Sequence, residues 1–128
     1  YLEECCPEYL LRGLLTLRDK PVWITENGCA CNDDRLRILY LARHFSAVSE
    51  AIRRGVNVRG FLVWSLMDNY EWGSYEPRFG LFSIDRTTFE AQAKPSASFF
   101  RETVERNSIS AEMILKYVPE WKDFSIYS

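Results

Sequence analysis

The pattern of apolar and polar positions predicts a helix followed by a strand at the start of the chain. Pro7 suits the first position of a helix that runs to Arg18. Helical spacing places four leucines on one face of it: Leu10, Leu11, Leu14 and Leu15. The β-prone run from Pro21 to Thr25 predicts a strand, in which proline is tolerated because it stands at the first position.

A second helix and strand follow in the same order. Asp33 or Asp34 can cap a long helix that runs to about Arg54, where Gly55 provides a C-terminal stop. The run from Val58 to Trp64 is almost continuously apolar, as is typical of a strand buried on both faces of a parallel sheet. The apolar face of the helix is expected to comprise Leu36, Leu39, Tyr40, Phe45, Val48 and Ile52.

The signals in the last third of the chain are weaker. A short extended piece is predicted over Gly80–Ile84, and Lys94-Pro95 opens a helix that carries Phe99, Phe100 and Val104. Ser110–Val118 is predicted to be helical, and the chain from Pro119 onward to be irregular. The order helix, strand, helix, strand, helix is that of βα units and predicts an α/β fold.

Both predicted strands end in polar and aromatic residues. The first strand delivers Glu26 to its end, and Asn27-Gly28 follows at once, where the backbone must turn sharply. The second strand runs into Leu66–Trp72, a loop rich in acids, amides and aromatic residues. Two strand ends that present Glu, Asn and Trp side by side indicate a sugar site.

Three motifs carry a resemblance to a known family. Ile24–Gly28, Val63–Trp72 and Arg78–Leu81 resemble, in this order, the C-terminal motifs of glycoside hydrolase family 1, the β-glucosidase family of (β/α)8 barrels. The resemblance covers roughly residues 7 to 106. A closed barrel needs eight strands and about 250 residues. The chain is therefore expected to be the C-terminal part of a TIM barrel, with the seventh and eighth βα units in residues 1–107 and a tail of unknown role in 108–128. The N-terminal part of the barrel is the expected missing partner.

The resemblance implies that Glu26 is the nucleophile of a retaining β-glycosidase. From the strand-end position alone, a glutamate that merely caps a nearby backbone amide is an equal alternative. Glu71 invites pairing with Glu26 as the general acid, but the family places that acid in an Asn-Glu-Pro motif, which the 128 residues lack. Glu71 instead matches the glutamate that binds two hydroxyls of the glycone, with a surface ion-pair acid as the alternative.

The same resemblance assigns three aromatic residues to the substrate site. Trp64 is expected to lie under the sugar ring and Trp72 to donate its indole N–H to a hydroxyl, with core packing as the alternative for both. Phe79 matches an aromatic residue at the pocket's edge, and a core position is equally open. Trp23 and Trp121 are expected to be packing residues, and Asp68 and Arg78 to organise the loop through ion pairs.

The loop also bears on the substrate. The phosphoglycosidase branch of the family replaces the Glu-Trp segment with residues that hold a 6-phosphate, whereas this chain keeps Glu71 and Trp72. A neutral β-glucoside or a related β-galactoside or β-fucoside is therefore the expected substrate. Residues Trp72–Arg78 are one residue shorter than in many members, which leaves the loop path near Tyr75 open. No metal or cofactor is expected, and the isolated chain is expected to be inactive because the general acid is absent.

Composition excludes other classes of function. A net charge of −2 and a pI of about 5.5 give no electrostatic footprint for nucleic acid. No apolar run reaches the roughly 18 residues that span a membrane. The cysteines are Cys5, Cys6, Cys29 and Cys31, without Cys-x-x-Cys spacing, and His44 is the single histidine.

Free thiols are accordingly expected rather than a disulfide or a metal site, and reduced cysteines weakly favour the cytoplasm. Two alternatives to the glycosidase reading stay open. One is a non-catalytic module that assembles with another chain or another copy. The other is a redox or metal protein built on the four cysteines.

Overall fold

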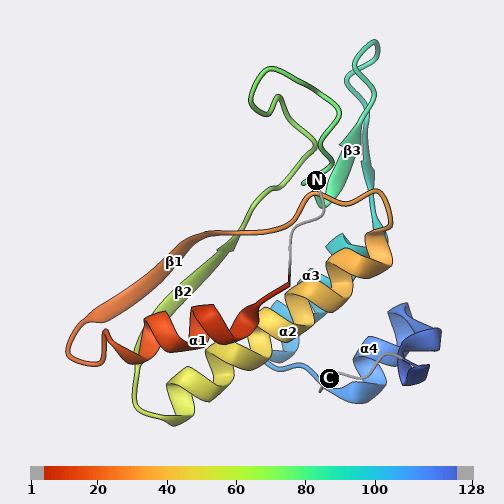
Figure 1. The fold of residues 1–128 in the computed structure, drawn as a ribbon. Helices are drawn as coiled ribbons and strands as arrows, with labels where there is room; N and C mark the ends of the chain where they lie inside the picture. The colour runs from red at the N-terminus through yellow and green to blue at the C-terminus, as the bar shows by residue number, and fades with distance from the viewer. Residues whose placement is uncertain (1–4, 124–128) are drawn as a thin grey trace.

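The computed structural model describes residues 5–123 as four α-helices, two short pairs of strands and a C-terminal 3-10 helix (Figure 1). Strand β1 is followed by helix α2 and then by strand β2, which is the predicted βα order. The elements are α1 (Pro7–Leu15), β1 (Pro21–Asn27), α2 (Asp34–Arg53), β2 (Asn57–Val63), β3 (Phe82–Ile84), β4 (Ala91–Ala93), α3 (Pro95–Arg106), α4 (Ala111–Tyr117) and η1 (Pro119–Asp123).

The ends of the first two helices follow from local chemistry. Asp33 caps α2, because its side chain accepts a hydrogen bond from the backbone N–H of Arg35. Gly55 follows the helix with a φ of +92°, which glycine adopts without steric cost. Helix α1 ends at Leu15, three residues earlier than predicted, and the Thr16 hydroxyl bonds the Gly13 carbonyl in the turn that follows.

Strands β1 and β2 pair in parallel, and their register shifts between Val22 and Trp23 and again, at a bulge, near the C-terminal end of β1. Ile24 pairs with Phe61 and Asn27 with Val63, so two residues of β1, Thr25 and Glu26, stand opposite one residue of β2. Such bulges re-aim side chains next to active sites. The backbone N–H of Trp64 then bonds the Asn27 carbonyl at 2.9 Å, which brings the two strand ends together.

The extended piece predicted over Gly80–Ile84 is strand β3, and its antiparallel partner β4 was not predicted. Strand β4 consists of Ala91-Gln92-Ala93, and all of these residues are exposed. The strand therefore has no buried face that a sequence pattern could indicate. The hairpin projects beyond the helices on the same side as the loop that follows β2 (Figure 1).

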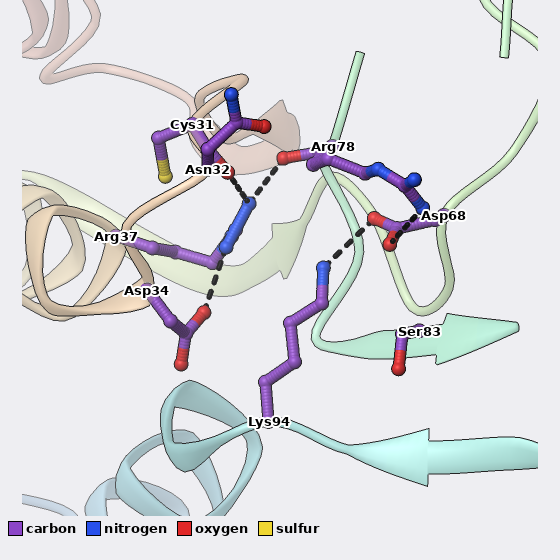
Figure 2. Close-up of a pocket in the computed structure, with 8 residues that line it drawn as sticks. All are labelled: Cys31, Asn32, Asp34, Arg37, Asp68, Arg78, Ser83 and Lys94. Atoms are coloured by element: carbon purple, nitrogen blue, oxygen red, sulfur yellow. Dashed lines mark hydrogen bonds and ion pairs between the residues drawn. The ribbon is translucent and has the colours of Figure 1, made fainter. Parts of the chain in front are cut away.

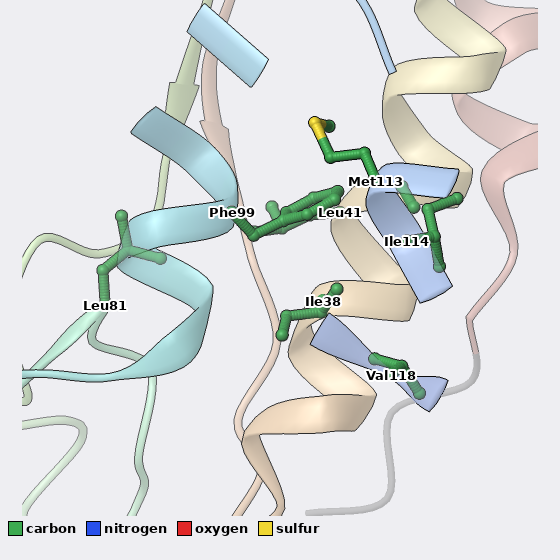
Figure 3. Close-up of a cluster of buried hydrophobic side chains, with 8 residues drawn as sticks. Ile38, Leu41, Leu81, Phe99, Met113, Ile114 and Val118 are labelled. Atoms are coloured by element: carbon green, nitrogen blue, oxygen red, sulfur yellow. The ribbon is translucent and has the colours of Figure 1, made fainter. Parts of the chain in front are cut away.

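The hydrophobic core lies in two clusters on either side of α2. One joins α1, the strand pair and the C-terminal half of α2; its buried residues are Leu14, Ile24, Val48, Ala51 and Val56. The other joins α2 to α3 and α4 (Figure 3); its buried residues are Ile38, Leu41, Ala42, Leu81, Phe99, Met113, Ile114 and Val118. The α1 face predicted from the four leucines packs into the first cluster, as expected.

The apolar face predicted for α2 is confirmed for Leu39, Tyr40, Phe45 and Val48 and is wrong for Leu36 and Ile52. Leu36 and Ile52 are 49% and 51% exposed, whereas Ile38, Leu41 and the alanines at 42, 47 and 51 are buried. Of the predicted set only Val48 is buried, while Leu39, Tyr40 and Phe45 are partly buried. The reason is that α2 contacts neighbours on two sides, so small residues that admit close approach carry the packing. Val104 of α3 is also exposed.

The segment after α3 packs onto the molecule. Asn107 ends α3 with a φ of +48°, and Ser110 caps α4 by accepting from the Met113 N–H. Met113 and Ile114 complete the second cluster, which Trp121 also contacts. The prediction of an irregular chain from Pro119 is wrong for Pro119–Asp123, which form η1; residues 124–128 lie outside the described part. The division of the chain at residue 107 stays a prediction.

One face of the β1–β2 pair carries the helices, and the residues that alternate with the buried ones face away from them. Trp23 and Leu62 are 61% and 50% exposed. Trp23 was expected to be a plain packing residue; its ring does cover Gly60, where an added Cβ would lie 2.2 Å from ring carbons. Most of its surface is nevertheless open, because no other described element covers this face. Among the described helices, none is long and apolar enough to cross a membrane.

Candidate active site

Glu26 occupies the C-terminal end of β1, inside the bulge and on the exposed side of the strand pair. Within the described part of the chain no hydrogen bond or ion pair engages its carboxylate. The backbone passes close by immediately afterward: a Cβ on Gly28 would lie 1.6 Å from the Trp64 carbonyl oxygen, so only glycine fits there. This contact holds the end of β1 against the end of β2.

Trp64 and Glu71 form a hydrogen-bonded pair at the end of β2. The indole Nε1–H of Trp64 donates to a carboxylate oxygen of Glu71 at 2.8 Å. Trp64 is 37% exposed and follows β2 directly, and its peptide bond to Ser65 is cis. The pair lies beside the strand end that carries Glu26, because the Trp64 N–H bonds the Asn27 carbonyl. Three of the five predicted site residues therefore lie at the C-terminal end of the strand pair: Glu26, Trp64 and Glu71.

Trp72 is at the tip of a tight turn rather than beside this pair. The backbone N–H groups of Glu71 and Ser74 bond each other's carbonyls, and the two central residues, Trp72 and Gly73, both have positive φ. This is the dihedral pattern of a two-residue hairpin turn. The Trp72 side chain is 96% exposed.

The loop between Trp64 and Leu81 is held by a buried carboxylate. Asp68 is 4% exposed, and one of its oxygens accepts from the Gly80 N–H and from the Lys94 ammonium, each at 2.8 Å. Its other oxygen lies 3.5 Å from Arg78, which confirms the predicted ion pair. The closer cation, Lys94, was not predicted, because it lies 26 residues along the chain.

Phe79 lies in the backbone strip Arg78–Leu81, which the Asp68 carboxylate holds through the Gly80 N–H. Its carbonyl accepts from the Ser65 N–H at 3.2 Å, next to Trp64, and the Leu81 N–H bonds the Ser65 carbonyl. The Phe79 ring is partly buried. Gly80 passes so close to the backbone of Met67 and Asp68 that an added Cβ would lie 2.2 Å from the Asp68 nitrogen.

A second buried charge, Arg37, braces the loop that follows Glu26 (Figure 2). Its guanidinium donates to the backbone carbonyls of Cys31 and Arg78 and to the Asp34 carboxylate. Asp34 in turn accepts from the N–H and the hydroxyl of Ser96 at the start of α3. Sequence reasoning missed this network; the one signal was an arginine within an otherwise apolar stretch of the helix.

The loop around Tyr75 forms an aromatic cluster. The rings of Tyr70 and Tyr75 meet edge to face with centroids 4.9 Å apart. The guanidinium of Arg86 lies 3.4 Å above the Tyr75 ring, as in a cation–π contact. This fixes the loop path that the sequence left open.

Among the described residues no group of three or more His, Cys, Asp or Glu side chains has an arrangement that could hold a metal ion. His44 is buried in α2, where its Nδ1 lies 2.8 Å from the Tyr40 carbonyl. Burial lowers the pKa of His44. The histidine is therefore a packed helix residue.

Comparison with known proteins gives a consistent result. The family model for glycosyl hydrolase family 1 matches residues 8–109. A β-galactosidase of Sulfolobus acidocaldarius is 44% identical over an alignment of 114 residues, and the match covers 86% of this chain and 23% of that protein. A 6-phospho-β-galactosidase of Staphylococcus haemolyticus is 40% identical over an alignment of 99 residues, and the match covers 69% of this chain and 21% of that protein.

The fold is similar to that of solved structures of the same kind. A β-glycosidase from Pyrococcus horikoshii matches with a TM-score of 0.81 and 38% identity, covering 87% of this chain and 27% of that chain. This chain thus spans between 21% and 27% of the length of the proteins that it resembles here.

Proposed function

This chain belongs to glycosyl hydrolase family 1, and from that premise we propose that it is part of a retaining β-glycosidase that acts through a covalent intermediate on Glu26. The enzymes of this family are (β/α)8 barrels. In the proposal, β1 and β2 are the seventh and eighth strands of such a barrel. The other strands and the general acid come from sequence outside these 128 residues.

One observation carries the proposal: Glu26 and the Trp64–Glu71 pair come from the C-terminal ends of two paired parallel strands. In (β/α)8 enzymes the chemistry lies at that end of the strands. A carboxylate free of ion pairs within the described residues is available as a nucleophile. It would attack the anomeric carbon while the acid protonates the leaving oxygen, and water would then release the sugar. The two carboxyl groups of a retaining enzyme lie about 5–5.5 Å apart.

The Trp64–Glu71 pair is suited to bind the glycone. Trp64 fixes one oxygen of the Glu71 carboxylate, so the carboxylate is oriented before a sugar arrives. Its remaining acceptor positions can take sugar hydroxyls, and hydrogen bonds to a charged acceptor are the stronger kind. The exposed indole face of Trp64 offers an apolar surface for the C–H face of a sugar ring.

Phe79 and Trp72 are assigned to the rim of the same site. Phe79 is connected to Trp64 through Ser65. Trp72 is an exposed aromatic side chain on the turn that begins at Glu71. For its indole N–H to reach a sugar hydroxyl, this turn must lie over the bound sugar.

A neutral glycone is the proposed substrate. Relatives of this chain include both a β-galactosidase and a 6-phospho-β-galactosidase at similar identity, so overall similarity does not distinguish the two classes. The charge of the loop favours the neutral class, because the Glu71 carboxylate would repel a phosphate brought to the same hydroxyl. Glucose, galactose and fucose are each compatible with a carboxylate acceptor.

Mechanism-based labelling tests the assignment of Glu26. A polypeptide that contains this chain within a complete barrel is treated with a 2-deoxy-2-fluoro-β-glucoside and digested. We expect one sugar mass on the peptide that contains Glu26, and none in Glu26→Gln. Glu76→Gln, an exposed glutamate of the loop, is the matched control and should label normally. A label on any other residue would refute the proposal.

A non-catalytic role in an assembly is the second candidate. It is favoured by the exposed face and by the two outer strand edges, which pair with nothing among the described residues. In that case the sugar-site residues would be remnants, and a complete barrel containing this chain would take no label.

A further inference from the structure

Two cysteines lie in the loop that directly follows the strand of Glu26. The sulfur atoms of Cys29 and Cys31 are 3.9 Å apart, within the range of a thiol hydrogen bond. Cys29 is buried and Cys31 is partly exposed. Cys31 also lines a cavity of about 210 Å³ together with Asp34, Arg37, Asp68 and Lys94, so its surroundings are polar and carry charges of both signs (Figure 2).

These surroundings favour the thiolate of Cys31. The hydrogen bond with the Cys29 thiol lowers the pKa of Cys31 to about 7, with the positive charges of Arg37 and Lys94 acting in the same direction. Partial burial and the carboxylate of Asp34 oppose this shift. Since the thiolate is the reactive form of cysteine, Cys31 is reactive near neutral pH.

We propose that Cys31 and Cys29 are a peroxide-sensitive thiol pair, in which Cys31 is oxidised first and Cys29 then closes a disulfide. The assignment rests on the geometry of this loop, and it holds whether or not Glu26 is a nucleophile. Within the described residues no disulfide joins the cysteines.

The chemistry balances with hydrogen peroxide as the oxidant. The Cys31 thiolate attacks one peroxide oxygen, the O–O bond breaks, and the departing hydroxide takes up the proton that the thiol lost. The product is a sulfenic acid. The Cys29 sulfur, on losing its proton, attacks the Cys31 sulfur; the S–O bond breaks and a second water leaves. Two thiols and one peroxide thus give one disulfide and two waters, the sulfurs losing two electrons and the peroxide gaining them.

Closure of the disulfide would displace the loop from its supports. The two sulfurs must approach from 3.9 Å to about 2.0 Å. The Cys31 N–H bonds the Arg78 carbonyl at 3.1 Å, and the Cys31 carbonyl accepts from Arg37 at 3.2 Å. These bonds connect to Phe79 and Ser65, and hence to Trp64. Oxidation is therefore expected to loosen the strip of backbone that supports the Trp64–Glu71 pair.

The pair should also be readily reduced. The residues are separated by one alanine, so the ring closed by the disulfide is small. Disulfides with distorted geometry store strain, and strained bonds are the labile and regulatory ones. The modification is thus expected to be reversible by a dithiol.

Mass spectrometry of the whole chain tests the proposal. After treatment with one equivalent of hydrogen peroxide at pH 7, we expect the peptide containing both residues to lose the mass of two hydrogens and to regain it with dithiothreitol. Cys29→Ser should instead accumulate a sulfenic acid on Cys31, detectable by dimedone. The double variant Cys5→Ser/Cys6→Ser is the matched control and should form the disulfide as the parent does.

Alkylation rates give a second measurement that needs no oxidant. In the unmodified chain the rate of Cys31 alkylation should rise with pH around a midpoint near 7. Cys29→Ala removes the hydrogen bond that lowers the pKa, so its rate at pH 7 should fall by about tenfold, as for a thiol of ordinary pKa near 8.5. A peroxide-induced disulfide that involves Cys5 or Cys6 instead would overturn the proposal. So would an alkylation midpoint of Cys31 in the ordinary range.

Discussion

At the scale of single residues, the candidate site depends on the hydrogen bond between Trp64 and Glu71. It orients a carboxylate that carries two acceptor oxygens, and it joins the end of β2 to the loop that follows. Neither residue type is unusual in a protein of this size. Their contact is informative because it places an aromatic face and a sugar-hydroxyl acceptor beside the strand end that carries Glu26.

Replacing Trp64 by Phe tests this contact. Phe keeps an aromatic face but removes the N–H, and a hydrogen bond to a charged group contributes about 1.5–3 kcal/mol. We therefore expect kcat/KM for an aryl β-glucoside to fall by at least about tenfold in a complete barrel that contains this chain. Trp121→Phe, a partly buried tryptophan of the second core cluster, is the control and should leave kcat/KM unchanged. An unchanged kcat/KM in Trp64→Phe would remove Trp64 from the site.

At the scale of elements, the contacts of α3 with α4 combine apolar packing with charge. Glu102 of α3 accepts from the Lys116 ammonium at 2.8 Å and from the Tyr117 hydroxyl at 2.9 Å, both in α4. The hydrogen bond from Lys116, followed by that from Tyr117, lowers the pKa of Glu102. Its side chain is 12% exposed and lies at the boundary of the two helices.

The sign of this shift gives a prediction for pH. A carboxylate whose pKa is lowered by folding contributes stability above its unfolded value, about 4.3 for glutamate, and loses it as the pH falls through the folded value. Protection of the α4 amides from hydrogen exchange should therefore decrease below about pH 4. Glu102→Gln should be less protected at pH 7 and should lack most of this dependence.

The matched control on the same helix is Glu105→Gln. Glu105 is 65% exposed, and its one interaction with the described residues is a 3.6 Å ion pair with Arg101. Its replacement should leave both the protection of α4 and its pH dependence unchanged. If Glu102→Gln and Glu105→Gln behave alike, the tie between α3 and α4 is apolar alone.

At the scale of the whole molecule, the strand pair has one covered and one open face. The described helices pack on the covered face, while Trp23 and Leu62 of the open face are largely exposed. The outer edges of β1 and β2 pair with no described strand, and such edges and faces are normally paired or covered. The remaining strands of a barrel would pair with both outer edges and would cover the open face.

This leads to a prediction about activity. The isolated 128 residues contain no Asn-Glu-Pro segment, so we expect negligible hydrolysis of an aryl β-glucoside. Adding the N-terminal three quarters of a family 1 barrel should restore turnover only if that part carries the Asn-Glu-Pro acid. Turnover by the isolated chain that Glu26→Gln abolishes would contradict the prediction, and a lack of restoration would favour the non-catalytic assembly.

The comparison of sequence and structure separates two kinds of information. The two strands, an aspartate cap at Asp33 or Asp34, the Gly55 stop and the family motifs were readable from the sequence, because each depends on neighbours within a few positions. The buried face of α2 was readable only in part, because it depends on which elements lie on its two sides. Strand β4 was missed because it is short, exposed and defined by its partner.

The sequence by itself determined the family, the βα order and which residues are candidates for the sugar site. Tertiary structure alone decided which of them meet: Trp64 with Glu71, Asp68 with Lys94 across 26 positions, and Asp34 with Ser96 across 62. It also decided that Trp72 is exposed and that Cys29 contacts Cys31. The physical reason is that a hydrogen bond depends on the distance between two groups in space. For residues far apart in the sequence, that distance is set by how all the intervening elements pack, and a local sequence pattern does not contain this information.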